Sequence, residues 1–345
     1  MKFWRGIAGT LALGFVGAGV VPAWACACGG YLSDADSRAR AYGEQALVRY
    51  DDARRTEEIT LSMAITGSSK KAAWIMPTPG PAKLELGDEN LFPRLDRITL
   101  PKVVIRKTYW PFRGLDLLQR DGASAGAAPG GVNVHEQMRL GPFQIARLGG
   151  GPAGVTDWLD ANGYVVPDGL AANLAPYLTE GWEIVAVKLA PQQTGGQLAG
   201  ETPPLRLTFG SEQIVYPMRL SKGATTAQKV TVYVAAQHRV DASTLPVAGV
   251  QPELLYAGRA LDPALPAPAD YLTAYRVSYP EPARITSDFT FTRAASDEPF
   301  QRIRYVTRNE PGWSTFGVLA GGVLLLVGGG LALFRRRSRV QDRVE

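Results

Sequence analysis

The stretch Glu58–Thr66, which reads EITLSMAIT, decides the fold class of this chain. Its apolar residues Ile59, Leu61, Met63 and Ile65 occupy every second position, and small or polar residues fill the positions between them. Side chains of a strand alternate between two faces, so this period of two predicts a strand with one face buried in a core.

Similar patterns recur on both sides of this stretch. We predict further strands at Ala46–Tyr50, Ala72–Met76, Val103–Tyr109, Val132–Leu140, Phe143–Leu148, Trp182–Leu189, Leu205–Phe209, Ile214–Leu220, Lys229–Ala236, Ile285–Arg293 and Arg302–Thr307. Gly67–Lys70 is expected to close a hairpin between Glu58–Thr66 and Ala72–Met76, and Pro77 to end the second of these strands. Strands in succession favour an α+β fold with mostly antiparallel sheets over a doubly wound fold.

Three short helices are predicted among these strands. They are Leu91–Ile98 with Asn90 as N-cap, Thr156–Ala161 with Thr156 as N-cap, and Leu170–Tyr177. Loops poor in apolar residues follow at 121–131 and 191–204. A boundary between two domains near residue 150 or 200 stays open.

Residues 1–25 are typical of a signal peptide. Lys2 and Arg5 precede the apolar stretch Ile7–Val21, and Ala23-Trp24-Ala25 has the form of a cleavage site. The mature chain is then expected to begin at Cys26. An uncleaved membrane helix and lipid attachment at Cys26 are the alternatives.

The stretch Phe316–Phe334, FGVLAGGVLLLVGGGLALF, holds 19 residues without a charge. A helix of this length spans about 30 Å, the thickness of the hydrocarbon core of a bilayer. Four arginines follow between positions 335 and 339. Arginines beside a span stay in the cytoplasm. We therefore predict a single-pass cell membrane protein with an extracytoplasmic domain at 26–312, a transmembrane helix at 316–334 and a basic cytoplasmic tail at 335–345.

The formal charge of +5 does not describe the predicted domain. The signal peptide contributes +2 and the tail contributes +3, so residues 26–315 are neutral. A neutral domain lacks the basic surface that nucleic-acid binding requires, and we expect no nucleic-acid partner. The expected partners are the membrane, contacted through Phe316–Phe334, and an envelope component or another protein.

Few side chains suggest chemistry. The two histidines, His135 and His238, are not accompanied by the G-x-S-x-G motif of a serine hydrolase. The most suggestive gathering of carboxylates and aromatic rings consists of Asp157, Asp160 and Asp168 with Trp158, Tyr164 and Trp182. Sugar-cleaving sites combine two carboxylates with stacking rings. Tryptophans at inward spacings belong more often to a core, however.

Cys26 and Cys28 are the only cysteines. The rest of the domain therefore cannot depend on disulfides. A Cys-x-Cys pair can close a strained ring, or it can bind a soft metal with help from elsewhere. The sequence shows no second ligand cluster that would complete a metal site. We accordingly predict no catalytic, cofactor-binding or metal-binding residues.

Several short pieces in a fixed order resemble a known family. They are Cys28-Gly29-Gly30, Ala46–Tyr50, Ala72-Ala73-Trp74-Ile75-Met76-Pro77-Thr78-Pro79, Trp158-Leu159, Asn162-Gly163-Tyr164, Tyr177, Gly181-Trp182, Val185, Lys188-Leu189, Pro204-Leu205, Val215-Tyr216-Pro217-Met218-Arg219-Leu220 and Val232-Tyr233-Val234. Together they resemble the bacterial domain of unknown function 2330 over most of residues 26–310. The resemblance implies a shared fold and a secreted or membrane-anchored envelope protein, and it supplies no catalytic residues.

The expected function follows from the topology and from the missing catalytic set. We expect an uncharacterised membrane-anchored extracytoplasmic protein that serves as a non-catalytic binding or interaction module of the envelope. The alternative is a carbohydrate-active cell-surface hydrolase that uses the carboxylates near Trp158 and Trp182.

Overall fold

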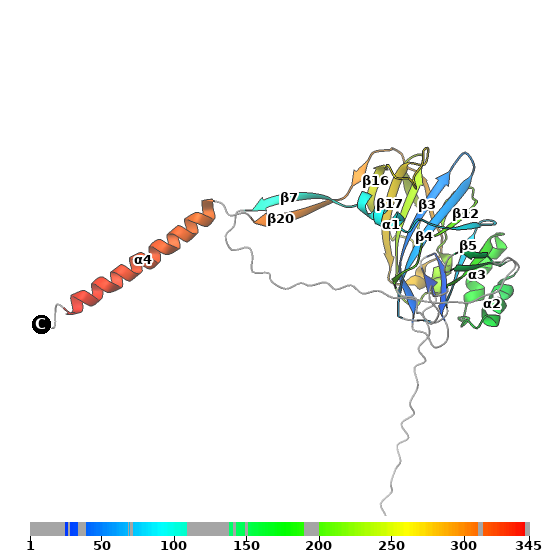
Figure 1. The fold of residues 1–345 in the computed structure, drawn as a ribbon, viewed down its shortest axis with the longest axis horizontal. Helices are drawn as coiled ribbons and strands as arrows, with labels where there is room; N and C mark the ends of the chain where they lie inside the picture. The colour runs from blue at the N-terminus through cyan, green and yellow to red at the C-terminus, as the bar shows by residue number, and fades with distance from the viewer. Residues whose placement is uncertain are drawn as a thin grey trace, which may run out of the picture.

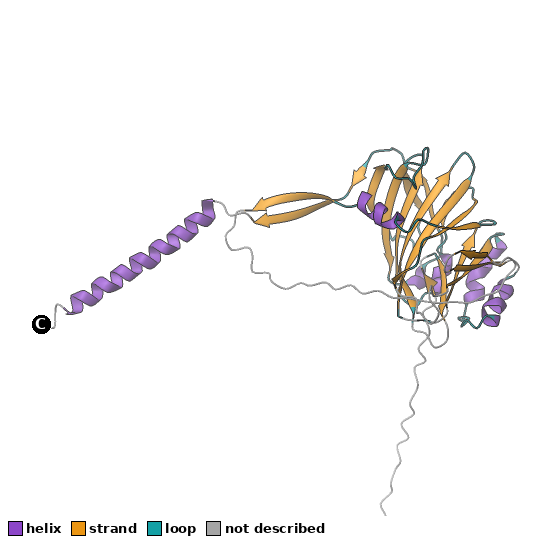
Figure 2. Cartoon of the chain, in the orientation of Figure 1, coloured by secondary structure: helices purple, strands orange, loops and turns teal. Residues whose placement is uncertain are grey.

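The computed structural model describes residues 25–26, 28–33, 39–67, 69, 72–108, 138–140, 143–148, 151–189, 200–309 and 313–341. Their strands build two main sheets that share one core, with helices on the outer faces (Figures 1 and 2). The prediction of a strand-rich α+β fold is confirmed. Most pairings between described strands are antiparallel, as the sequence indicates.

The larger sheet has nine described strands. Its path runs through β19 (Phe300–Gln301), β16 (Glu253–Arg259), β17 (Tyr271–Tyr279), β14 (Gln228–Ala236), β3 (Arg40–Asp51), β4 (Thr56–Thr66), β12 (Leu205–Gly210) and β6 (Lys83–Leu86), and β11 (Gly200–Glu201) adds to β4. The alternation in β4 sets its buried face, because Ile59, Leu61, Met63 and Ile65 are all 2% exposed or less. Only β3 and β14 pair in parallel within the described part of this sheet.

The second sheet has six described strands, and a smaller sheet packs beside it. The six are β1 (Ala25–Cys26), β2 (Gly29–Ser33), β5 (Ala72–Thr78), β10 (Glu183–Leu189), β9 (Phe143–Leu148) and β8 (Met138–Leu140). The smaller sheet consists of β13 (Ile214–Tyr216), β18 (Phe289–Arg293) and β15 (Val240–Thr244). All three sheets contribute to the main core, in which Val48, Trp74 and Phe289 are buried.

Helices cover the outer faces of both main sheets. In β5, Trp74 and Met76 face the main core, whereas Ala73 and Ile75 face α2 (Pro152–Ala161) and α3 (Leu170–Thr179). On the larger sheet, the opposite face packs against α1 (Leu91–Ile98). Two 3₁₀ turns, η1 (Arg219–Gly223) and η2 (Pro282–Arg284), lie between strands. The layers therefore run α1, larger sheet, second sheet, then α2 with α3.

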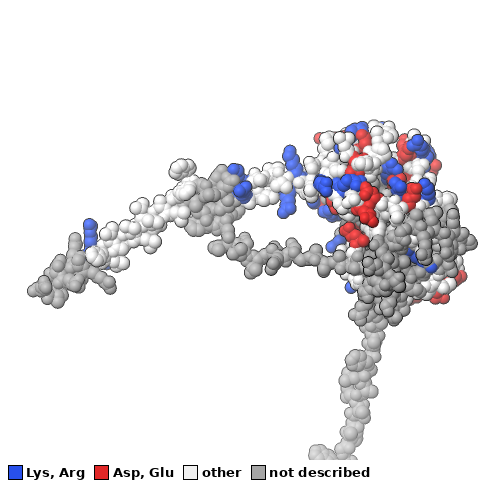
Figure 3. All heavy atoms as spheres, in the orientation of Figure 1, with Lys and Arg blue, Asp and Glu red and all other residues white. Residues whose placement is uncertain are grey.

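A two-stranded ribbon leads away from this body. It consists of β7 (Lys102–Thr108) and β20 (Ile303–Asn309), which pair in parallel and project toward α4 (Trp313–Gln341) (Figure 1). Within α4, the 21 residues Phe316–Arg336 have a mean hydropathy of 2.2, and none of this apolar stretch is buried in the described structure. This helix is long and apolar enough to cross a membrane, as the sequence predicts. Figure 3 shows mixed charges on the body and basic side chains along the ribbon.

The predicted hairpin between Glu58–Thr66 and Ala72–Met76 is wrong. β4 pairs with β3 and β12, whereas β5 lies in the second sheet between β2 and β10. Both strands send apolar residues into the same core, so their local patterns do not reveal that they belong to different sheets. Pro77 also continues β5. The pairing of β2 stops at Ile75, which leaves an open edge where a residue without an N–H group is tolerated.

The predicted start of the second helix is also wrong. α2 begins at Pro152, and Thr156 lies inside it, where its hydroxyl donates to the oxygen of Ala153 at 2.9 Å. Proline suits the first position of a helix, because its missing N–H would have no partner there. α1 has the predicted bounds, although the side chain of Asn90 makes no capping hydrogen bond.

Eight described strands are absent from the prediction, namely β1, β2, β6, β11, β15, β16, β17 and β19. The predicted strand Ile214–Leu220 ends at Tyr216 and continues as η1. Only the last three residues of the predicted strand Val132–Leu140 are described. The predicted loop 121–131, residues 191–199 of the second predicted loop and His135 lie outside the described residues.

Candidate functional site

Cys26 and Cys28 lie at the tip of the β1–β2 hairpin, at the beginning of the described body. Cys26 pairs with Gly29 across the hairpin, and β2 then runs along β5. Gly29 is required at this place, because a Cβ would lie 2.0 Å from the backbone oxygen of Ile75. The hairpin is thus pressed against β5, and this close approach fixes the positions of the two thiols.

A carboxylate from the other main sheet meets these thiols. Glu44 of β3 places one oxygen so that this atom and the two Sγ atoms all lie within 4.8 Å of one another. Cys28 is 0% exposed, Cys26 is 1% exposed and Glu44 is 5% exposed. We call these three residues the thiol–carboxylate cluster. It lies where the second sheet and the larger sheet share their core.

Two buried hydroxyl groups support the thiol–carboxylate cluster. Tyr216 of β13 donates its hydroxyl hydrogen to Oε1 of Glu44, and Ser221 of η1 donates to the backbone oxygen of Cys26. Both side chains are fully buried. The cluster and its supports therefore come from segments far apart in the sequence.

The electrostatics of the cluster depend on its burial. Removal from water raises the pKa of the Cys28 thiol well above its ordinary value, and the neighbouring Cys26 and Glu44 raise it further. Cys28 is therefore a neutral thiol at pH 7 when nothing else is bound. Sulfur and carboxylate ligands are those that Zn²⁺ takes in proteins, so these three residues could hold such a metal.

The sequence pattern misses Glu44. The sequence feature that could have indicated it is its position: Glu44, Ala46 and Val48 lie on one face of β3, and all three are buried. An acidic residue on the inward face of a strand is uncommon unless it has a partner. A longer predicted strand, starting before Ala46, would have exposed this anomaly.

The buried position of Cys26 bears on the alternative of lipid attachment. Its side chain is 1% exposed and belongs to the main core. A lipid on this sulfur would have no room unless β1 left the sheet. The fold therefore disfavours a lipidated Cys26.

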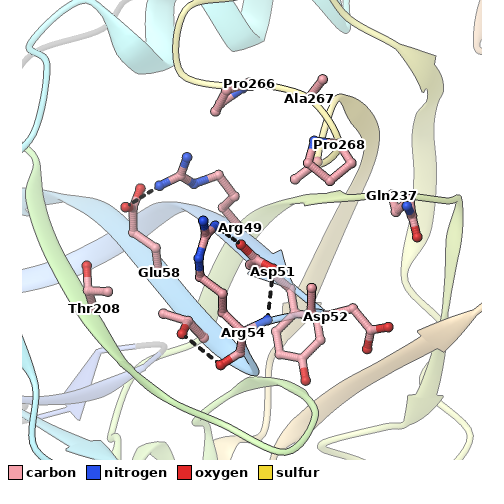
Figure 4. A pocket seen from close by; sticks show the side chains of 14 residues that line it. Arg49, Asp51, Asp52, Arg54, Glu58, Thr208, Gln237, Pro266, Ala267 and Pro268 are labelled. Carbon is pink, nitrogen blue, oxygen red and sulfur yellow. Dashed lines mark hydrogen bonds and ion pairs between the residues drawn. The ribbon is translucent and has the colours of Figure 1, made fainter.

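A pocket of ≈ 340 Å³ with several charged side chains in its lining opens at the end of β3 and β4. Arg49 and Glu58 form an ion pair of 2.5 Å on one wall, and Arg54 binds Asp51 at 2.6 Å beside it. Figure 4 shows the segment 266–268 across from these pairs. The hydrogen bonds that Arg54 donates lower the pKa of Asp51. The pocket thus combines two ion pairs and the further carboxylate of Asp52 with a proline-containing wall.

The predicted gathering of carboxylates and aromatic rings around Trp158 and Trp182 does not form a sugar-cleaving site. The carboxylates are exposed at Asp157, Asp160 and Asp168. Both tryptophans are half-buried and pack on the core beneath α2 and α3. The centroid of the Trp182 ring lies 5.0 Å from the centroid of the Tyr177 ring. The tryptophans therefore belong to the packing of the core, whereas the three carboxylates lie on the solvated surface. His238 lies elsewhere, with Nδ1 2.7 Å from a carboxylate oxygen of Asp297.

The fold and the site define a class: a strand-rich α+β body with a buried thiol–carboxylate cluster, followed by one apolar helix long enough to span a membrane. The bacterial family DUF2330, described as an uncharacterized protein conserved in bacteria, matches residues 22–292. The chain therefore belongs to the DUF2330 family, and the resemblance drawn from the sequence is confirmed. A comparison with curated proteins finds no match.

Proposed function

We propose that this chain is a single-pass membrane protein of the bacterial envelope whose body lies on the extracytoplasmic side and acts as a non-catalytic binding module. The observation that carries the proposal is the exposure of α4. Its 21-residue apolar stretch has no buried part in the described structure. An apolar surface of this size is not stable in water, and a bilayer core is the surrounding that matches its length.

The charges at the two ends support the proposed orientation. Arg335, Arg336 and Arg337 directly follow Phe334, the last residue of the uncharged run, and such residues favour the cytoplasmic side. The ribbon on the other side is also basic, with Lys102, Arg106 and Arg304 among its residues. A folded domain crosses the membrane largely regardless of its charge, so the ribbon does not oppose this orientation.

The ribbon gives the body a position from which it can bind. It separates α4 from the two-sheet body, and its side chains Val103, Ile105 and Tyr305 are more than half exposed. In the proposed orientation it holds the body away from the headgroups. The pocket of Arg49 and Glu58 opens on this body, and its charged side chains suit a polar part of an envelope component.

The orientation is tested by adding a protease to spheroplasts that make the full chain. We expect residues 26–312 to be digested and a fragment that contains α4 and the tail to remain. Permeabilised spheroplasts are the control, in which the tail is digested as well. A body that survives in sealed spheroplasts while the tail is lost would refute the proposal.

Binding is tested by sedimentation of the purified full chain with isolated envelope fragments. Ala53→Trp fills the pocket, and we expect it to lower the cosedimented fraction at least several-fold. Ala153→Trp, at an exposed position of α2, is the matched control and should bind like the wild type. Equal binding by both variants would remove the pocket from the proposal. Turnover of an envelope polymer that stops when one carboxylate is replaced would establish the hydrolase alternative, which no contact among the described residues favours.

A further inference from the structure

We propose that Cys26, Cys28 and Glu44 bind one Zn²⁺ ion between the two main sheets. This inference does not depend on the proposed function, because it concerns a site inside the body. It assigns a ligand to a cluster that the anchoring and binding roles leave unused.

The separations suit a metal of this size. Zn²⁺ lies about 2.3 Å from thiolate sulfur and about 2.0–2.2 Å from carboxylate oxygen, so neighbouring ligand atoms in a tetrahedral site are roughly 3.3–3.8 Å apart. The three ligand atoms here all lie within 4.8 Å of one another. Small side-chain rotations close the remaining gap, and the backbone can stay in place.

The chemistry of the ligands selects the ion. Thiolates exclude Ca²⁺ and Mg²⁺, which take oxygen ligands, and a carboxylate is a poor ligand for Cu(I). Two thiolates and one carboxylate carry three negative charges. A divalent ion leaves one of them, whereas a monovalent ion leaves two. Because burial penalises net charge, the divalent ion is favoured in this core.

The surroundings are those of a supported site. Tyr216 donates to Oε1 of Glu44 and orients the carboxylate, as outer partners of metal ligands do. The buried Nε1 of Trp74 has no hydrogen-bond acceptor among the described residues. It borders the hairpin tip, since a Cβ at Gly29 would lie 3.2 Å from it. Three protein ligands leave a fourth position on Zn²⁺, and this N–H could bond to a group bound there.

A disulfide is the competing state of the two thiols. Closing a bond between Cys26 and Cys28 would remove both thiolate ligands and leave the buried Glu44 carboxylate beside an apolar bridge. The metal accounts for the carboxylate as well as for the thiols. Because the cluster is buried, Zn²⁺ would enter as the chain folds rather than by exchange at the surface.

The test is metal binding by the full chain in detergent, purified with a non-thiol reductant. We expect one Zn²⁺ per chain by elemental analysis. Refolding with Co²⁺ in place of Zn²⁺ should give thiolate-to-cobalt charge-transfer absorption and the intense visible bands of a tetrahedral site. A chain that folds but binds neither metal, or binds Co²⁺ without the thiolate absorption, would overturn the proposal.

Two buried carboxylates provide a matched pair of variants. Glu44→Gln keeps an acceptor for Tyr216 but removes the charged ligand, and we expect Zn²⁺ affinity to fall at least about 10-fold. Glu57→Gln changes another fully buried glutamate, on β4, and should leave the affinity unchanged. Equal affinities in the two variants would contradict the assignment. So would material isolated from cells without reductant in which Cys26 and Cys28 form a disulfide and no metal is present.

Discussion

Asp288 ties α3, η1 and the loop before β18 together, and its removal should destabilise the body strongly. Its carboxylate accepts hydrogen bonds from the hydroxyl of Tyr177, from the backbone N–H of Met218 at 2.7 Å and from the backbone N–H of Arg219 at 3.0 Å. The Nε–H of Arg219 adds a fourth bond at 2.7 Å. Tyr177 and Met218 are fully buried, so water cannot replace the lost acceptor.

The magnitude follows from these four bonds. A net value of about 1 kcal/mol for each hydrogen bond gives about 4 kcal/mol for Asp288→Ala. A folded domain is stable by only about 5–15 kcal/mol, so the loss is a large fraction of the total. It corresponds to a decrease in Tm of about 8–16 °C.

Urea unfolding of the full chain in detergent, followed by tryptophan fluorescence, measures this loss. Glu180→Ala is the matched control, because Glu180 binds the same guanidinium of Arg219 from the surface, with its side chain 46% exposed. An exposed pair contributes about 0–1 kcal/mol. The two expected losses of unfolding free energy differ because Asp288 is buried and Glu180 is exposed. A loss below about 1 kcal/mol for Asp288→Ala, or equal losses in both variants, would therefore refute the reasoning.

Three further expectations follow from single contacts. Gly29→Ala should destabilise the body by at least about 1–3 kcal/mol, measured by urea unfolding, because the new Cβ meets the oxygen of Ile75; an unchanged midpoint would contradict the close approach. Burial raises the pKa of Glu57, so the folded chain keeps a proton that the unfolded chain loses above pH 4.5. The unfolding free energy therefore falls as the pH rises from 4.5 toward the pKa of Glu57 in the folded chain. Glu57→Gln should remove this fall, and parallel pH profiles of the unfolding free energy for variant and wild type would count against it. A chain without Trp313–Gln341 and the residues after it should stay soluble without detergent, and its recovery in the membrane fraction would show that another segment anchors it.

Local patterns in the sequence predict much of the fold. Leu170, Leu174 and Tyr177 recur at helical spacing, and all three are fully buried in α3. The strand Phe143–Leu148 has the predicted bounds. These elements are predictable because their buried faces follow from the geometry of a single strand or helix. Strand partners are different, since β5 carries the same kind of pattern whether it pairs with β4 or with β10.

The candidate site divides in the same way. The sequence shows that Cys26 and Cys28 form a closely spaced pair, but it does not show which residues surround them. Glu44 reaches them because β3 lies in the facing sheet, and Tyr216 reaches Glu44 from an element more than 170 residues further along the chain. Pairings of this range depend on how whole sheets stack, which no local pattern contains.

The sequence by itself determined the elements that one segment can specify: the alternation of β4, the helical face of α3 and the uninterrupted apolar length of α4. In β4 and α3, an apolar repeat of two or 3.6 residues dictates which face is buried. In the uncharged stretch of α4, the apolar residues follow one another without such a repeat, and the whole surface of that stretch is apolar. The tertiary structure alone decided that β4 and β5 belong to different sheets and that Glu44 lies beside two thiols. The physical reason is that packing of one sheet on another is a contact between distant segments, and its free energy depends on the complementarity of both faces rather than on the pattern of either one.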